Sequence, residues 1–74
     1  MQKEKTYDLK KRRLALGLTL REVAANAGLT APAVMAIERG GFRGKIGTRA
    51  RLAKALDIPL SNLMTAEEKD LFLK

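Results

Sequence analysis

The side chains of this sequence that could do chemistry are mostly cationic. The chain holds 15 Lys and Arg against 8 Asp and Glu, a formal net charge of +7 over 74 residues. No acidic residue lies between positions 39 and 54, where six basic residues gather: Arg39, Arg43, Lys45, Arg49, Arg51 and Lys54. Lys10-Lys11-Arg12-Arg13 is a second cluster. Neutralised phosphates release counterions, so this density favours a polyanionic partner. Charge alone does not separate nucleic acid from a membrane surface, or from a basic surface that only keeps the domain soluble.

Other chemistries lack the residues they need. The sequence has no His and no Cys, hence no imidazole base, no thiolate nucleophile and no metal ligands of the usual kind. The glycine-rich stretch 40–47 follows a predicted helix, whereas a phosphate-binding loop joins a strand to a helix. We therefore predict no enzymatic activity, no catalytic residue, no metal and no cofactor. No apolar run approaches a membrane span and the N-terminus lacks a signal-peptide core, so we expect a cytoplasmic protein without a membrane partner.

A pair of short helices within residues 19–40 should position the larger basic cluster. Each helix has an N-cap, an apolar pair that fixes the direction of the chain before it, and a glycine that can end it. The residues that carry this signal are the caps Thr19 and Thr30, the capping-box partner Glu22, the apolar pairs Leu18–Val23 and Leu29–Val34, and the stops Gly28 and Gly40. Two such helices joined by a tight turn can seat one helix against a DNA groove.

The rest of the chain also predicts helices, and no segment alternates with period 2 for long enough to be a strand. The fold class is therefore all-α. The other expected helices are residues 7–16 with Thr6 as cap and Gly17 as stop, residues 46–56, a short helix from Pro59 to about Met64, and a last helix that opens on the capping box Thr65-Ala66-Glu67-Glu68 and carries Leu71 and Phe72. We divide the chain into a flexible N-terminus at 1–5, a helix-turn-helix domain at 6–64, and a C-terminal helix or tail at 65–74.

The apolar positions of these helices predict one modest core. Its expected members are Leu9, Leu16, Leu18, Val23, Ala24, Ala27, Leu29, Val34, Ile37, Ile46, Leu52, Ala53, Leu56, Ile58 and Leu63.

The ordered set of residues along the chain resembles the lambda-repressor/Cro-like helix-turn-helix family, often called XRE-type. The similarity runs without gaps from about Leu9 to Leu63. It is carried by Arg13, Gly17, Thr19, Val23-Ala24, Gly28, Thr30, Val34, Ile37-Glu38-Arg39-Gly40, Leu52-Ala53-Lys54-Ala55-Leu56 and Leu63. The resemblance implies a five-helix lambda-repressor-like DNA-binding domain, here with a short extra C-terminal helix, in which the third helix is the recognition helix.

The resemblance also implies roles for single residues. Arg13 and Glu38 should form a partly buried ion pair that orients the third helix. The implied DNA phosphate contacts are Arg13, Leu20, Arg21, Arg43, Lys45, Thr48 and Arg49. The family usually has glutamine where this chain has Leu20, so the backbone N–H groups of Leu20 and Arg21 remain as phosphate donors. The family usually has an apolar residue where this chain has Arg49, and a merely solvated side chain is the alternative reading there.

The recognition helix departs furthest from the family. The groove-facing residues that the resemblance implies are Ala31, Pro32, Ala33, Met35 and Ala36, with Arg39 at the helix end. Relatives typically carry Gln, Arg, Ser or Asn at the first five positions, whereas none of these side chains has a polar head. Bidentate reading of guanine or adenine is therefore excluded there. Thymine-methyl contacts, Arg39 and DNA shape remain, so we expect lower base selectivity than the family norm.

Two functions stay open at this point. The first is a small DNA-binding transcription regulator, a repressor or antitoxin-type autorepressor, that binds double-stranded DNA as a homodimer. Its candidate dimer surface is Leu60, Met64, Leu71, Phe72 and Leu73, and packing of the last helix on its own core is the alternative. The second is a protein-interaction module that binds a toxin or another regulator through the apolar surface of the third helix or through the C-terminus.

Overall fold

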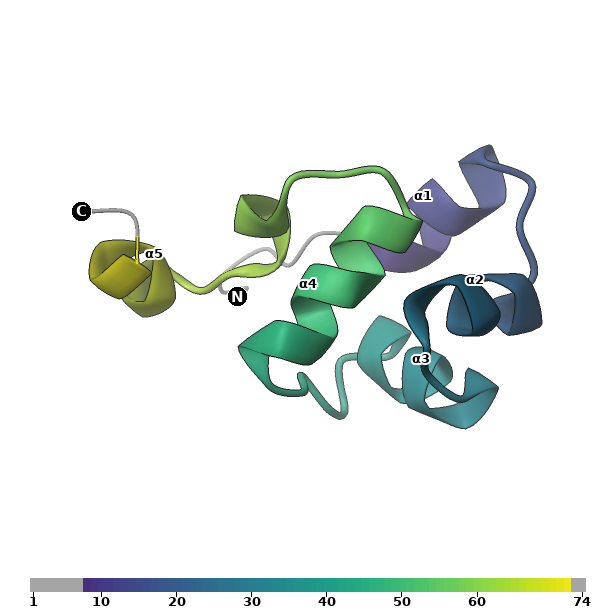
Figure 1. Ribbon diagram of the computed structural model, residues 1–74, viewed down its shortest axis with the longest axis horizontal. Helices are drawn as coiled ribbons and strands as arrows, with labels where there is room; N and C mark the ends of the chain where they lie inside the picture. The colour runs from purple at the N-terminus through teal and green to yellow at the C-terminus, as the bar shows by residue number, and fades with distance from the viewer. Residues whose placement is uncertain (1–7, 73–74) are drawn as a thin grey trace, which may run out of the picture.

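The computed structural model describes residues 8–72 of the chain (Figure 1). Within this range every regular element is helical, which confirms the predicted all-α class. The elements are α1 (Leu9–Ala15), α2 (Leu20–Ala27), α3 (Ala31–Glu38), α4 (Ile46–Ala55), the 3₁₀ helix η1 (Leu60–Leu63) and α5 (Ala66–Phe72). The expected fifth helix is thus the 3₁₀ turn η1, and α5 is the expected extra C-terminal helix.

The predicted N-caps of the helix pair are present. The Thr19 hydroxyl accepts a hydrogen bond from the Glu22 amide at 3.1 Å, and the Glu22 carboxylate accepts one from the Thr19 amide at 2.8 Å. The Thr30 hydroxyl accepts from the Ala33 amide at 3.2 Å. These bonds satisfy amides that the first turn of a helix leaves without partners. Local sequence therefore fixes where α2 and α3 begin.

The predicted start of the first helix is wrong. α1 begins at Leu9 rather than at Tyr7, because the Asp8 side chain accepts a hydrogen bond from the Lys11 amide at 3.0 Å and so acts as the N-cap. Thr6, the expected cap, lies outside the described residues, as does Tyr7.

The prediction that Leu16 belongs to the core is also wrong, since 39% of this residue is exposed. α1 ends at Ala15, and Leu16 is its C-cap. The chain then turns at Gly17, which adopts a φ of 72°. Leu16 thus lies at the very end of the helix, beyond the turn in which Leu9 and Arg13 are buried.

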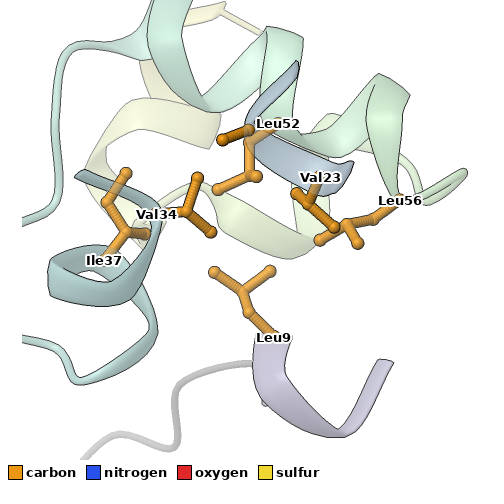
Figure 2. Packing of buried hydrophobic residues seen from close by; sticks show 7 residues of the cluster. Leu9, Val23, Val34, Ile37, Leu52 and Leu56 are labelled. Carbon is orange, nitrogen blue, oxygen red and sulfur yellow. The ribbon is translucent and has the colours of Figure 1, made fainter. Parts of the chain in front are cut away.

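The core lies where α2 meets α3 and α4, with α1 closing it through Leu9 (Figure 2). Its buried apolar residues are Leu9, Val23, Ala24, Ala27, Val34, Ile37, Leu52, Ala53 and Leu56. Leu18, Leu29, Ile58 and Leu63 pack against it while partly exposed, and Ile46 is half-buried. The core is small, as predicted, so polar contacts between helices should matter for stability.

The helices α1 to α4 cluster together, whereas α5 stands to one side beyond η1 (Figure 1). η1 packs against α4. None of the helices described between residues 8 and 72 has the length and apolar character needed to cross a bilayer.

Candidate nucleic-acid interface

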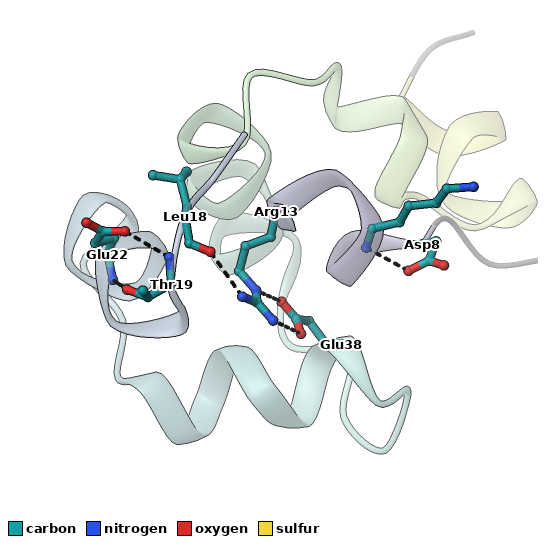
Figure 3. A network of polar contacts seen from close by, with 7 residues as sticks. Asp8, Arg13, Leu18, Thr19, Glu22 and Glu38 are labelled. Atoms are coloured by element: carbon teal, nitrogen blue, oxygen red, sulfur yellow. Dashed lines mark hydrogen bonds and ion pairs between the residues drawn. The ribbon is translucent and has the colours of Figure 1, made fainter. Parts of the chain in front are cut away.

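The ion pair of Arg13 and Glu38 joins α1 to the end of α3 (Figure 3). Arg13 Nε donates to Glu38 Oε2 at 2.7 Å and Nη2 donates to Oε1 at 3.2 Å. Its Nη1 donates to the Leu18 carbonyl at 3.0 Å, just before α2. The side chains are only 9% and 7% exposed. The hydrogen bonds that Arg13 donates to Glu38 raise the pKa of Arg13 against the opposing effect of burial. The predicted pair is confirmed, and it fixes α3 relative to α1 and to the start of α2.

The first turn of α2 offers free amide groups. The capping box occupies the amides of Thr19 and Glu22, whereas no acceptor within residues 8–72 meets the amides of Leu20 and Arg21. The Leu20 side chain packs partly against the core, which accounts for an apolar residue at a position where a polar one is usual. These two N–H groups, at the positive end of a helix, suit an anion such as phosphate.

α3 presents a surface almost without polar groups. Val34 and Ile37 are buried, and the remaining side chains of the helix lie on its outer side or at its ends. Pro32 and Met35 are exposed, with Met35 at 38%. Ala31, Ala33 and Ala36 are half-buried, and Arg39 is exposed at the C-cap. The six predicted groove-facing residues therefore all reach the surface to some extent.

The loop between α3 and α4 carries two exposed cations, Arg43 and Lys45. They flank Gly44, which has a φ of 81°. A Cβ atom added at Gly44 would lie 3.4 Å from Thr48 Cγ2 and 3.6 Å from Phe42 Cε2. These are ordinary van der Waals distances, so it is the left-handed backbone that favours glycine at this position. Thr48 is half-buried in the first turn of α4 beside the loop.

Arg49 does not belong with these phosphate candidates. The expected phosphate contact and the alternative of a solvated side chain both require an exposed residue, whereas Arg49 is only 4% exposed. Its guanidinium donates to both carboxylate oxygens of Glu68 at 2.7 Å and to the Leu63 carbonyl at 2.8 Å. A guanidinium held in this way has little capacity left for DNA. The sequence predicts for Glu68 only the capping box with Thr65. This box is present, with hydrogen bonds of 3.0 and 3.1 Å.

Arg12 is a second residue whose role the sequence did not reveal. Its Nε donates to the Leu56 carbonyl at 2.9 Å and its Nη2 to the Asp57 carbonyl at 3.2 Å. It therefore satisfies carbonyls at the end of α4, where helices leave such groups without partners. The partners are 44 and 45 residues away in sequence, so no local spacing could have indicated the contact.

The predicted dimer surface is described only in part. Leu60 and Met64 are half-buried, whereas Leu71 on α5 is 75% exposed. The side chain of Phe72 and the whole of Leu73 lie outside the described residues.

Comparison with known proteins assigns the chain to a family. The family described as Helix-turn-helix matches residues 9–63. The chain is also similar to the restriction-modification controller protein C.AhdI from Aeromonas hydrophila, whose crystal structure has been solved. The two are 33% identical, the match covers 77% of this chain and 86% of that one, and the TM-score is 0.71. No curated protein matches the chain significantly. The chain thus belongs to the helix-turn-helix family of the lambda-repressor/Cro-like, or XRE, type and is a DNA-binding transcription regulator.

Proposed function

We propose that this regulator represses transcription by placing α3 in the major groove of an operator, with most of its affinity coming from phosphate contacts. The observation that carries the proposal is the contrast between the exposed Arg43 and Lys45 and the apolar outer surface of α3. Cations and helix N-termini bind phosphate whatever the sequence. Ala, Pro and Met offer base edges little beyond contact with thymine methyl groups.

The proposed phosphate-binding set is the amides of Leu20 and Arg21 together with Arg43, Lys45 and Thr48. Arg13 serves mainly to orient α3, since its nitrogens are engaged by Glu38 and Leu18. The likeness to a restriction-modification controller supports a role in transcription control. Occupancy of a promoter by the protein would exclude polymerase, as a repressor or an antitoxin-type autorepressor does.

A homodimer is part of the proposal. A single module of this size buries limited DNA surface, so tight specific binding calls for two copies on half-sites about 34 Å apart. The surface proposed for the second copy includes Leu60, Met64 and the exposed Leu71.

Selection from a randomised duplex library tests the proposal, with the enriched sequences scored for motif and symmetry. We expect a palindromic motif of low information content in which thymine is enriched. A reporter gene behind the selected site should lose expression when the protein is produced. Enrichment of strongly specified guanines at the α3 positions would contradict the assigned groove-facing residues, and increased reporter expression would contradict repression.

A protein-interaction module is the second candidate, favoured by the exposed apolar residues Met35, Phe42 and Leu71. In this case the apolar surface of α3 or the C-terminus would bind a toxin or another regulator. This second function is favoured if no duplex is enriched in the selection. It is also favoured if alanine at Arg43 and Lys45 leaves the affinity for every nucleic acid unchanged.

A further inference from the structure

Arg49 connects three separate segments of the protein. Its Nε donates to the Gly44 carbonyl in the loop after α3 at 3.3 Å. Its Nη1 donates to the Leu63 carbonyl at the end of η1 at 2.8 Å. The two terminal nitrogens also bind both oxygens of Glu68 on α5, each at 2.7 Å. One side chain thus holds together the loop, η1 and α5.

The pairing with Glu68 is what makes this arrangement possible. The Arg49 side chain is 5% exposed and that of Glu68 is 24% exposed, so the guanidinium needs a charged partner to compensate for its lost hydration. Its planar fork matches a carboxylate in the bidentate manner and leaves further N–H groups for carbonyls. Glu68 is itself held by the Thr65 amide at 3.0 Å. Its place is therefore fixed by the first turn of α5.

Gly44 lies between the two exposed cations of the loop, Arg43 and Lys45. The start of α4 has no side-chain cap at Lys45, so this boundary lacks the usual contact that fixes a loop to a helix. The Arg49 bond to Gly44 supplies a contact at the same point. The direction of the Gly44 peptide sets where the residues on either side of it point, because φ and ψ are the only soft backbone torsions.

We infer that Arg49 is a positioning residue for DNA binding, which fixes the loop that presents Arg43 and Lys45 and makes this fixation depend on Glu68 of α5. The inference rests on the proposed function, in which these two cations contact phosphate. It assigns α5 to the DNA-binding unit without any contact between α5 and DNA.

A pair of matched variants tests the inference. Glu68→Gln and Glu67→Gln remove the same charge from the first turn of the same helix. Glu67 is exposed, and its side chain makes no hydrogen bond or ion pair within residues 8–72. General electrostatics predicts slightly tighter DNA binding for both variants, because each makes the protein more positive. The inference predicts the opposite for Glu68→Gln, namely binding weaker by about fivefold or more as phosphate contacts become less ordered.

Duplex binding is measured over a range of salt concentrations, with each affinity expressed per folded molecule from circular dichroism melts. A purely stabilising role of the pair would then leave affinity and salt slope unchanged. We expect Glu68→Gln to reduce the magnitude of the slope of log affinity against log salt concentration by about 1 to 2, since each phosphate contact contributes about 0.9. Arg49→Lys should do the same, because lysine keeps the charge but cannot make these bonds together.

Identical affinity and slope for the two glutamine variants would overturn the inference, as would a wild-type slope in Arg49→Lys. Failure of the proposed function has a different signature, since the wild-type protein itself would then show no salt-dependent duplex binding.

Discussion

Within residues 8–72, two arginines are buried, and each is neutralised by one glutamate. The pKa of both guanidinium groups is raised, chiefly by the hydrogen bonds that they donate to their carboxylate partners. The two pairs act at different places. Arg13 and Glu38 fix the orientation of α3, whereas Arg49 and Glu68 hold the loop and α5. A buried charge that loses its partner is costly, so these pairs should be sensitive to single substitutions.

Replacement of Glu38 by alanine should lower the free energy of unfolding by about 3 kcal/mol, because it leaves the Arg13 guanidinium buried without its partner. The measurement is a urea denaturation curve for each variant. Glu67→Ala is the control, as this exposed carboxylate should change the free energy by no more than about 0.5 kcal/mol. A loss below about 1 kcal/mol for Glu38→Ala would show that the pair behaves as a solvated surface pair.

The contribution of Glu68 to stability should depend on acidity. Hydrogen bonds from Arg49, and then from the Thr65 amide, lower the pKa of Glu68 from 4.5 to about 2. The folded state therefore binds fewer protons here than the unfolded state does. The stability from this group is fully present above about pH 4.5 and is lost as the pH falls towards 2. The difference in unfolding free energy between wild type and Glu68→Gln should thus be constant near neutral pH and shrink on acidification. A difference that grows on acidification would contradict the assignment.

At this scale the sequence predicted only part of the site. The Arg13–Glu38 pair followed from the family resemblance, which supplies long-range information that a single sequence lacks. The Arg49–Glu68 pair spans 19 residues and departs from the family pattern, so neither source indicated it. The sequence predicts a phosphate contact for Arg49, because a basic side chain among other basic side chains gives no sign of a buried partner that lies far away in the sequence.

At the scale of elements, the signals that worked are those confined to a few residues. The capping boxes at Thr19 and Thr65 form as predicted, because each depends only on residues three positions apart. Helix ends follow the same logic at Gly17, Gly28 and Gly40, all with positive φ. α4 ends differently, since Asp57 adopts a φ of 56° where no glycine is present. The predicted start of α1 is wrong because Thr and Asp are both favoured N-cap residues, and spacing alone does not decide between Thr6 and Asp8.

Two glycine-to-alanine substitutions should have opposite effects. Gly28 ends α2 with a φ of 70°, so Gly28→Ala should destabilise the protein by about 1 kcal/mol through backbone strain. Gly47 lies within α4, and a Cβ atom there meets nothing within 4 Å. Gly47→Ala should therefore stabilise it by about 0.5 kcal/mol. Thermal melts of the two variants check this pair of signs, and a stabilising Gly28→Ala would contradict the described turn between α2 and α3.

The surface of α3 yields a prediction about specificity. Met35 is exposed on this helix and has no polar head with which to read a base. Met35→Gln adds an amide that can bind adenine in the bidentate manner. Selection with this variant should therefore change the preferred sequence at one position of each half-site, while the salt slope stays the same. An unchanged motif would show that Met35 does not face the groove.

At the scale of the molecule, the count of 15 Lys and Arg residues overstates the number of cations that are free to meet a partner. Arg13 and Arg49 are neutralised in the interior, and Arg12 binds carbonyls at the end of α4. Arg51 and Lys54 lie around a shallow hollow beside the end of α2. Arg43 and Lys45 stay exposed in the loop. Composition therefore predicts the class of partner, whereas only the fold separates cations that can contact DNA from those that hold helices together.

The salt dependence of duplex binding tests the central claim most directly. Wild-type protein and the double variant Arg43→Ala/Lys45→Ala are titrated with the selected duplex, and Lys10→Ala/Lys69→Ala controls for the loss of two exposed charges. We expect the affinity of the wild type to fall steeply with salt. In the loop variant, the slope of log affinity against log salt concentration should be smaller in magnitude by about 2. The control should stay close to the wild type, and the preferred sequence should be the same for all three proteins. Equal slopes for the loop variant and the wild type, or wild-type binding that ignores salt, would contradict a protein that holds DNA mainly by its phosphates.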